Sequence, residues 1–195
     1  MKRTGGALAL ALLGLVAAGP SARALEVGDR APAFEARDEA GNVWKASDHV
    51  GQKIVVLYFF PADFTGGCTK QACGFRDSYQ KLAAEGVEVV GVSGDSAATH
   101  AMFKKQHQLP FTLLADEGGA IARQFGVPTG AGGEVKIEFE GVDLSVERGI
   151  TASRWTFVIG GDGSIVHKDE KVDSADDAER VLELVGKLDQ ADAAR

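Results

Sequence analysis

A nearly unbroken run of apolar residues, 53–60 (Lys-Ile-Val-Val-Leu-Tyr-Phe-Phe), constrains the fold of this chain more than any other segment. Most of its residues are β-branched or aromatic, and no polar positions alternate with them. Such a run is typical of a strand that is buried on both faces, as in the centre of an α/β sheet. Pro61 ends the run, because proline has no backbone N–H to donate to a sheet. The rest of the chain must therefore cover this strand from both sides.

The segments that follow alternate between predicted helices and strands. A helix over residues 67–84 carries Phe75, Tyr79 and Leu82 on one face, and Gly86 ends it. The other predicted helices and strands are helices over 96–107, 116–125 and 174–188, and strands over 87–92, 111–114, 155–159 and 164–167. Short turns around 40–42 and 160–163 predict hairpins. This order of elements predicts an α/β fold with a mixed central sheet flanked by helices on both faces.

Residues 129–150 interrupt the alternation. Gly130, Gly132 and Gly133 predict a flexible loop, and residues 134–139 alternate like an exposed strand. Two interpretations of this segment stay open: it covers a site, or it forms a subunit contact.

The N-terminus has the three parts of a secretory signal peptide. A positive start at Lys2 and Arg3 precedes an apolar run over 7–18, and Ala22-Arg23-Ala24 forms a small-x-small cleavage site. A membrane anchor is the alternative, but a spanning helix needs roughly 20 apolar residues, and this run is shorter. We therefore expect a periplasmic or secreted protein, cleaved after Ala24, with residues 25–195 forming a single domain.

The net charge excludes two classes of partner. The 195-residue chain carries −7, and residues 25–195 carry −10, because residues 1–24 contain three basic residues and no acidic one. An acidic surface repels nucleic-acid phosphates and anionic lipid headgroups. We expect no nucleic-acid partner and no membrane association after signal cleavage.

No cofactor and no metal site is predicted. Residues 87–94 follow a strand but lack the G-x-G-x-x-G pattern of a dinucleotide site. The four histidines show no ligand spacing with the cysteines: His49, His100, His107 and His167. His100 and His107 fall on one helix, where we expect them to be solvated surface residues.

The two cysteines of the chain, Cys68 and Cys73, indicate chemistry and not a structural link. A structural disulfide stabilises most when it closes a long loop, and this pair closes a very short one. Cys68 follows the buried strand and lies in the first turn of the next helix. Unpaired backbone N–H groups and the helix dipole favour negative charge there, and the thiolate is the reactive form of cysteine.

Three further residues are candidates for the same site. Thr65 lies on the turn before Cys68, where it caps the helix, directs its hydroxyl into the pocket, or does both. Arg154 starts a strand that we expect beside the first one, so its guanidinium could hold both a thiolate and an oxygen of the substrate. A surface arginine is the alternative. Pro61 ends the strand and would also shield the pocket from water.

These residues match a known pattern. Pro61-x-x-x-Thr65-x-x-Cys68 resembles the active-site motif of peroxiredoxins, and a second cysteine five positions on resembles the peroxiredoxin Q (bacterioferritin comigratory protein) group. Residues 154–159 (Arg-Trp-Thr-Phe-Val-Ile) resemble the later Arg-x-Thr-Phe strand of that group. The resemblance extends from about residue 27 to the final helix and implies a thioredoxin-like fold.

The resemblance also implies a role for each candidate. Cys68 would be the peroxidatic cysteine and Cys73 the resolving one. Thr65 and Arg154 would be the activating donors. Pro61 and Gly67 would line the substrate pocket.

The implied function is a thiol-dependent peroxidase for hydrogen peroxide and organic hydroperoxides. Cys68 would form a sulfenic acid that condenses with Cys73 into an intrachain disulfide. A thioredoxin-like dithiol would reduce that disulfide, and we expect a monomer or a weak dimer. The alternative is a non-enzymatic redox sensor or a thiol–disulfide exchange protein of the same fold, although the exchange class uses Cys-x-x-Cys, which is absent here.

The chain departs from the group at two positions, and the spacing of its two cysteines has a geometric consequence. Gly66 stands where the group usually has proline, and Gln71 stands where it often has an acid. On a regular helix, Cα atoms five residues apart are separated by about 8.7 Å, whereas a disulfide needs less than roughly 7 Å. We therefore expect the first turns of the helix to unwind in each cycle, helped by Gly66, Gly67 and Gly74.

Overall fold

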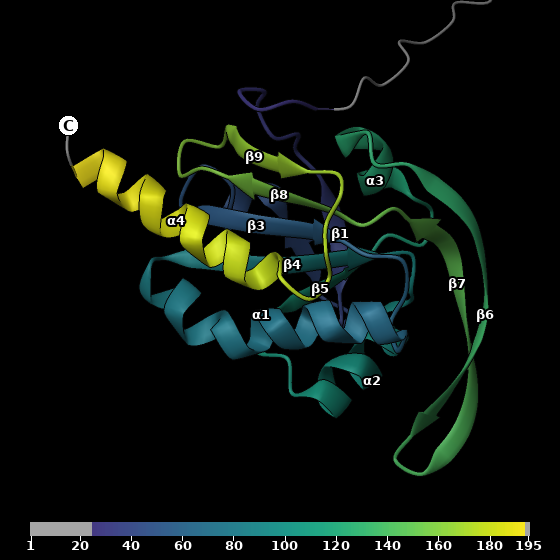
Figure 1. Cartoon of the computed structure of the whole chain (residues 1–195). Coiled ribbons are helices and arrows are strands. Elements are labelled where there is room, and N and C mark those ends of the chain that lie inside the picture. The colour runs from purple at the N-terminus through teal and green to yellow at the C-terminus, as the bar shows by residue number, and fades with distance from the viewer. Residues whose placement is uncertain (1–24, 194–195) are drawn as a thin grey trace, which may run out of the picture.

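The computed structural model describes residues 25–193, and its main body is a seven-stranded mixed sheet (Figure 1). The strand order is β2-β1-β5-β4-β3-β8-β9. The strands of this sheet are β1 Glu35–Asp38, β2 Val43–Lys45, β3 Ile54–Phe59, β4 Val87–Ser93, β5 Thr112–Ala115, β8 Trp155–Ile159 and β9 Ile165–Asp169. β3, β4 and β5 run parallel, whereas β8, β9, β1 and β2 pair antiparallel with their neighbours.

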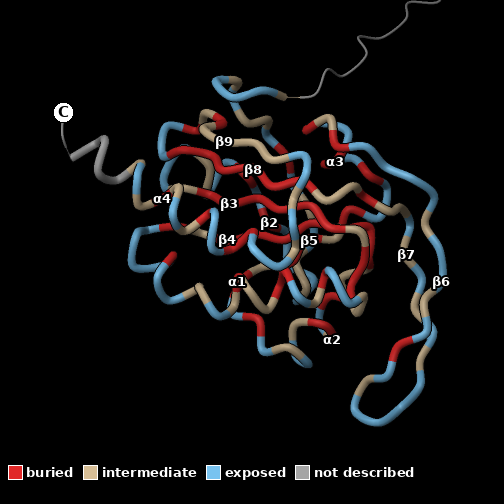
Figure 2. The backbone as a smooth tube through the Cα atoms, viewed as in Figure 1, coloured by how far each residue is buried: buried red, intermediate tan, exposed pale blue. Residues whose placement is uncertain are grey.

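β3 is the central strand that the apolar run predicts. It pairs with β4 on one side and with β8 on the other, and its residues from Val55 to Phe59 are fully buried. Figure 2 shows this buried centre in red, with exposed backbone confined to the periphery. Because successive side chains point to opposite faces, β3 contributes to two separate cores.

Helices cover both faces of the sheet, as predicted. α1 (Gly66–Ala84), α2 (Ala97–His107) and α4 (Asp177–Ala193) pack on the face that carries Val56 and Tyr58. α3 (Ala120–Phe125) and the segment around Phe34 cover the opposite face. The helix ends follow the sequence signals: Ser96 accepts a hydrogen bond from the Thr99 N–H at the start of α2, and Gly86 has a φ of 71° just after α1.

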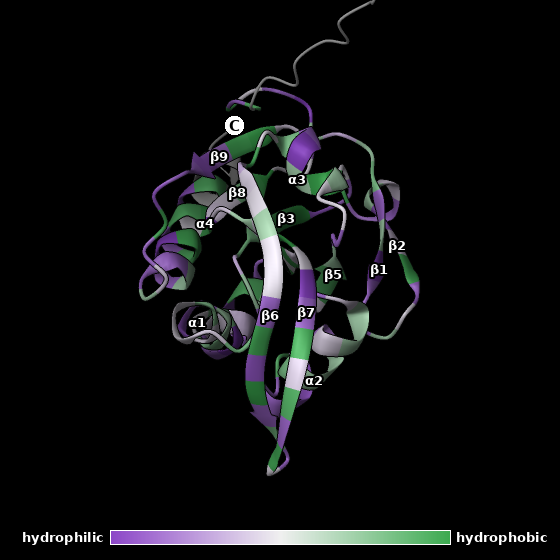
Figure 3. Ribbon diagram, turned by 90° about the vertical axis from the view of Figure 1, so that its right-hand side faces the viewer, coloured by the Kyte–Doolittle hydropathy of each residue, from purple (hydrophilic) through white to green (hydrophobic). Residues whose placement is uncertain are grey.

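The flexible loop expected from the glycines at 130–133 is wrong, whereas the exposed strand expected at 134–139 is part of β6. β6 (Thr129–Phe139) and β7 (Val142–Ala152) form a long two-stranded hairpin, paired from Thr129↔Ala152 to Phe139↔Val142. Figure 3 shows the two strands side by side, extending away from the sheet. Gly132 serves close backbone approach, because a Cβ there would lie 2.0 Å from the carbonyl oxygen of Arg148.

The base of the hairpin is fastened to the main body. The Gly149 N–H donates to the carbonyl of Gly94, just after β4, at 2.9 Å. A Cβ on Gly149 would lie 2.1 Å from the carbonyl oxygen of Glu117. Near the tip, Lys105 of α2 forms an ion pair with Glu140 and lies over the ring of Phe139.

Within residues 25–193, none of the helices has the length and apolar character needed to cross a membrane. The predicted signal peptide at 1–24 lies outside the described residues.

Candidate active site

Cys68 lies where the sequence predicts it, in the first turn of α1. β3 ends at Phe59, a short loop follows, and α1 begins at Gly66. The Cys68 side chain is buried, with 1% of its surface exposed, and its thiol is free. This position beyond the carboxyl end of a central strand is where ligands bind in open α/β sheets.

Arg154 reaches the same point from the other end of the chain. It lies in the short connection between β7 and β8, next to Trp155, which pairs with Phe59 at the end of β3. Its Nη2 atom donates a hydrogen bond to Cys68 Sγ at 3.2 Å. A guanidinium at this distance stabilises a thiolate, which is the nucleophilic form of cysteine. The surface alternative for Arg154 is thus excluded.

A chain of hydrogen bonds continues from Arg154 into the protein. The Arg154 Nη1 atom donates to Gln71 Oε1, and Gln71 Nε2 donates to Asp177 Oδ2 at 2.7 Å. The hydroxyl of Thr156 donates to the same Asp177 oxygen at 2.8 Å. Gln71, Thr156 and Asp177 are all buried.

Two opposing effects act on the pKa of Asp177. Burial raises the pKa of Asp177 above its ordinary value, and hydrogen bonds from Gln71 and Thr156 lower it in part. Asp177 is also the first residue of α4, where the helix dipole favours a negative charge. The sequence prediction missed Asp177, and no local motif marks it.

The sequence-predicted residues around Cys68 take different positions. Thr65 is the N-cap residue by backbone geometry, but its hydroxyl donates to the carbonyl of Ala62 at 3.0 Å and makes no side-chain cap bond. Gly67 lies against the arginine: a Cβ there would be 3.3 Å from Arg154 Nη2. Pro61 is half-buried and directly follows Phe60 at the end of the central strand.

Cys73 lies on α1 with Cys68, and its thiol is also free. Both residues are within one continuous helix, so the five-residue spacing separates their Cα atoms by about 8.7 Å. That distance exceeds the limit of roughly 7 Å for a disulfide. Forming a Cys68–Cys73 bond therefore requires this part of α1 to rearrange.

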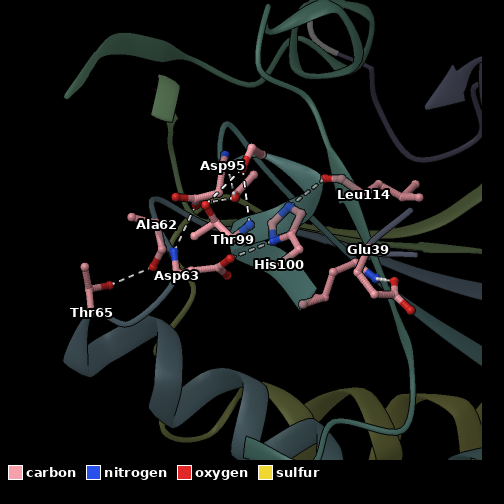
Figure 4. A network of polar contacts seen from close by, with 11 residues as sticks. Glu39, Ala62, Asp63, Thr65, Asp95, Thr99, His100 and Leu114 are labelled. Carbon is pink, nitrogen blue, oxygen red and sulfur yellow. Dashed lines mark hydrogen bonds and ion pairs between the residues drawn. The ribbon is translucent and has the colours of Figure 1, made fainter. Parts of the chain in front are cut away.

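His100 corrects a sequence prediction. It is fully buried and not a solvated surface residue. Its Nδ1 atom lies 2.7 Å from Asp63 Oδ2, and its Nε2 atom lies 3.2 Å from the carbonyl oxygen of Leu114 (Figure 4). The periodicity placed His100 on α2 correctly, but it could not show that Asp63 would be brought opposite to it.

The Asp63–His100 pair fixes the loop that precedes Cys68. The Asp63 N–H donates to Asp95 Oδ2 at 2.9 Å, and Asp95 accepts a further bond from Ser93 at 2.6 Å. Burial raises the pKa of Asp63, and His100 lowers it only in part. Burial alone would lower the pKa of His100, but the charge and hydrogen bond of Asp63 raise it above its ordinary value.

The fold and the site together define a class: a thioredoxin-like α/β domain with a cysteine at the first turn of a helix and an arginine against its sulfur. Residues 27–168 match the AhpC/TSA family. The chain belongs to this family.

The curated relatives carry names from one branch of it. A protein of Coxiella burnetii named as a peroxiredoxin bcp is 39% identical over 166 residues, covering 84% of this chain and 99% of the relative. The peroxiredoxin Q of Oryza sativa subsp. japonica is 54% identical over 101 residues, covering 52% of this chain and 46% of the relative. The chain thus spans about half the length of the plant relatives it matches. These names confirm the resemblance to the peroxiredoxin Q group.

Solved structures agree with the fold. The peroxidoxin BcpB of Mycobacterium tuberculosis has a TM-score of 0.69 and 30% identity, covering 84% of this chain and 97% of its own. The bacterioferritin comigratory protein of Xanthomonas campestris, described for its alkyl peroxide reduction activity, has a TM-score of 0.65 and 25% identity over 79% of this chain and 90% of its own. The predicted thioredoxin-like fold is confirmed.

The prediction of a periplasmic or secreted location is wrong. The peroxiredoxin Q relatives from Oryza sativa, Triticum aestivum and Sedum lineare are named as chloroplastic, a location that does not agree with export. Signal peptides and plastid transit peptides both combine basic residues with few acids. The charge pattern of residues 1–24 therefore did not separate the two destinations.

Proposed function

We propose that this protein is a thiol-dependent peroxidase that reduces hydrogen peroxide and organic hydroperoxides, with Cys68 as the peroxidatic cysteine. The observation that carries the proposal is the Arg154 guanidinium, 3.2 Å from the sulfur of a cysteine at the start of a helix. Membership of the AhpC/TSA family and the peroxiredoxin names of its relatives support the same reaction.

In the proposed first step the Cys68 thiolate attacks one oxygen of the peroxide. An S–O bond forms as the O–O bond breaks, giving a sulfenic acid and an alkoxide or hydroxide that takes up a proton. Negative charge develops on the departing oxygen, so a donor aimed at it lowers the barrier. Arg154 is the proposed donor, because its fork of N–H groups can contact both the sulfur and an oxygen.

Thr65, Pro61 and Gly67 are proposed to shape the pocket. The Thr65 hydroxyl would turn from the carbonyl of Ala62 to a peroxide oxygen when substrate is bound. Pro61 would keep water away from the sulfur, and Gly67 would leave room for the guanidinium.

Cys73 is the proposed resolving cysteine. Its thiol would displace the sulfenic oxygen as water and form a disulfide with Cys68. A thioredoxin-like dithiol would then reduce this disulfide by exchange and leave as a disulfide itself.

We propose a monomer or a weak dimer, which light scattering over a range of protein concentrations would test.

Intact mass after one equivalent of hydrogen peroxide tests this cycle on reduced protein. The wild type should lose about 2 Da as the disulfide forms, and Cys73→Ser should gain about 16 Da as the sulfenic acid accumulates. An unchanged mass after minutes in both proteins would reject the peroxidase function. Continued peroxide consumption with a thioredoxin-like reductant would separate an enzyme from a redox sensor, which reacts once and stops.

A further inference from the structure

The side-chain amide of Gln71 connects the site to a buried acid. It is 1% exposed and lies between two ionisable groups, the guanidinium of Arg154 and the carboxylate of Asp177. An amide has one acceptor oxygen and one donor nitrogen. In this structure the oxygen faces Arg154 and the nitrogen faces Asp177.

Arg154 and Asp177 together fix this orientation. Arginine can only donate and an ionised carboxylate can only accept. If the Gln71 amide turned over, its N–H₂ group would face the N–H groups of Arg154 and its oxygen would face the Asp177 oxygen. Both hydrogen bonds would be lost inside a buried site, where each unpaired polar group costs about 1–3 kcal/mol.

Asp177 is itself fixed in place. Its Oδ2 atom accepts from Gln71 and from Thr156, and Thr156 lies on β8, two residues after Arg154. The carboxylate therefore joins three elements: α1 through Gln71, β8 through Thr156, and its own helix α4. Ser174, just before α4, lies close to Gly67 of α1, since a Cβ on Gly67 would be 3.6 Å from the Ser174 hydroxyl oxygen.

We propose that Asp177 is a positioning residue for the Cys68 site, acting through Gln71 to hold the Arg154 guanidinium against the sulfur. The proposal rests on the function proposed for Cys68 and assigns that site a buried carboxylate from the C-terminal helix. It also accounts for the glutamine at position 71. An acid at that position would place two carboxylates within hydrogen-bonding distance inside the protein, where like charges raise each other's pKa.

Exchanging the two side chains tests the relay. In Asp177→Asn the amide at 177 can present either its oxygen or its nitrogen to Gln71, so Arg154 alone still orients the Gln71 amide. In Gln71→Glu two carboxylates face each other. In the double variant Gln71→Glu/Asp177→Asn, the new carboxylate accepts from Arg154, and the new amide donates to that carboxylate.

The measurement is the rate of Cys68 alkylation by iodoacetamide against pH, in a Cys73→Ser background. Alkylation reports the thiolate without any peroxidase activity, so it remains informative if the proposed function fails. Each single variant should shift the pH of half-maximal rate upward and lower the rate at neutral pH by up to about tenfold, the fall in thiolate fraction for a shift of one pH unit. The double variant should return the rate at neutral pH to within about threefold of the parent, because the two changes are coupled. Its pH of half-maximal rate should return toward the parent value.

Two further variants make the test independent of folding defects. Asp176 is the exposed neighbour of Asp177, and its carboxylate lies 3.7 Å from the Arg180 guanidinium. Asp176→Asn should leave the pH profile unchanged. Thr156→Val removes one bond to Asp177 and should shift the profile in the same direction as Asp177→Asn, but less.

A merely structural role for Asp177 would lower thermal stability in the single variants without moving the pH profile. That result would overturn the proposal, as would a double variant no better than the worse single variant. The peroxide assay on the same proteins is read separately: an unreactive parent rejects the peroxidase, whereas the alkylation profiles still decide the role of Asp177.

Discussion

The guanidinium of Arg154 occupies space that exists because residue 67 has no side chain. A Cβ at position 67 would lie 3.3 Å from Arg154 Nη2, which is closer than carbon and nitrogen atoms normally pack. Gly66, the preceding residue, has open space around its Cα. The two adjacent glycines therefore differ: Gly67 leaves room for the Arg154 guanidinium, whereas a side chain at position 66 would meet no neighbouring atom.

Gly67→Ala should slow the reaction of Cys68 with peroxide, because the added methyl group displaces the guanidinium by a few tenths of an ångström. We expect a fall of roughly three- to tenfold, since a misplacement of 1 Å costs about a hundredfold. Gly66→Ala is the matched control and should react at the wild-type rate. Stopped-flow measurement of the second-order rate constant checks both, and equal rates for the two variants would contradict the assignment.

The buried Asp63–His100 pair predicts how stability depends on pH. The pKa of His100 is raised in the folded protein, so its contribution is full below the ordinary histidine value of about 6.5 and is lost as pH rises through the folded value. The pKa of Asp63 is also raised, so its contribution is lost in the same sense, as pH rises from the ordinary aspartate value of about 3.9 through the folded value. The free energy of unfolding should fall above neutrality by about 1.4 kcal/mol for each unit of the His100 shift.

His100→Asn tests this dependence, because its amide can still donate to Asp63 but does not titrate. Urea unfolding at pH 6.5 and pH 9 should show a smaller loss of stability in the variant than in the wild type. A wild-type stability that rises over this interval would show that the pair does not hold its proton as described.

The candidate site residues nearest to Cys68 could be predicted from the sequence, and the residues that support them could not. Cys68 and Thr65 follow from a local pattern after a buried strand, and Arg154 follows from the strand pairing expected beside it. Asp177 is 106 residues from Gln71 along the chain, and its contact depends on how α4 crosses α1. Periodicity gives the buried face of a helix, but not which residue of another helix it meets.

At the scale of elements, α1 carries both cysteines in a geometry that prevents them from joining. Its first turn contains Gly66 and Gly67, and Gly74 follows Cys73. Glycine within a helix costs roughly 1 kcal/mol relative to alanine, so this part of α1 is its weakest. Beyond this stretch the helix is held by Leu82, which is fully buried.

Amide hydrogen exchange should therefore differ between the reduced and oxidised forms over residues 66–76. The disulfide requires the Cα atoms to approach to below roughly 7 Å, so the helical hydrogen bonds of this stretch must break on oxidation. Mass-spectrometric exchange should show loss of protection there, with the segment around Leu82 unchanged. Identical protection in both forms would reject the unwinding of α1.

The β6–β7 hairpin is the element that the sequence predicted least well. Its glycines were interpreted as flexibility, because a glycine in a loop and a glycine beneath a crossing backbone look alike in sequence. Gly149 belongs to the second kind, since β7 passes within contact of Gly94 and Glu117 there. Figure 3 shows how far the hairpin extends beyond this attachment.

Gly149→Ala should destabilise the protein by about 1–3 kcal/mol, the usual cost of overpacking, because its methyl group would meet the Glu117 carbonyl. Gly130→Ala, on the paired strand, meets nothing within 4 Å and should be neutral or slightly stabilising. Chemical denaturation of the two variants measures the difference. Equal stabilities would mean that the hairpin base is not tightly seated.

At the scale of the whole molecule, one sheet joins two cores. The tryptophans Trp44 and Trp155 lie in the core on the α3 face, whereas α1, α2 and α4 cover the other. The sequence predicted this layering because strands buried on both faces require it. It did not give the strand order, which depends on long-range pairing of β8 with β3.

The two cores should unfold together, so that residues 25–195 behave as one domain. Phe75→Ala, on the helical face, should cost about 3–5 kcal/mol and lower the midpoint of tryptophan fluorescence as much as that of circular dichroism. Coincident transitions are the mark of two-state unfolding. A fluorescence midpoint that stays at the wild-type value would show that the faces unfold separately.

The distance along the chain between Cys68 and Arg154 also has a consequence during synthesis. The two residues are 86 positions apart, and ribosomes add about 5–20 residues per second. For roughly 4–17 s the nascent chain therefore carries Cys68 without the cation that stabilises its thiolate. Through this interval Cys68 has no guanidinium beside it, so we expect a half-made chain to react with peroxide more slowly than the finished protein.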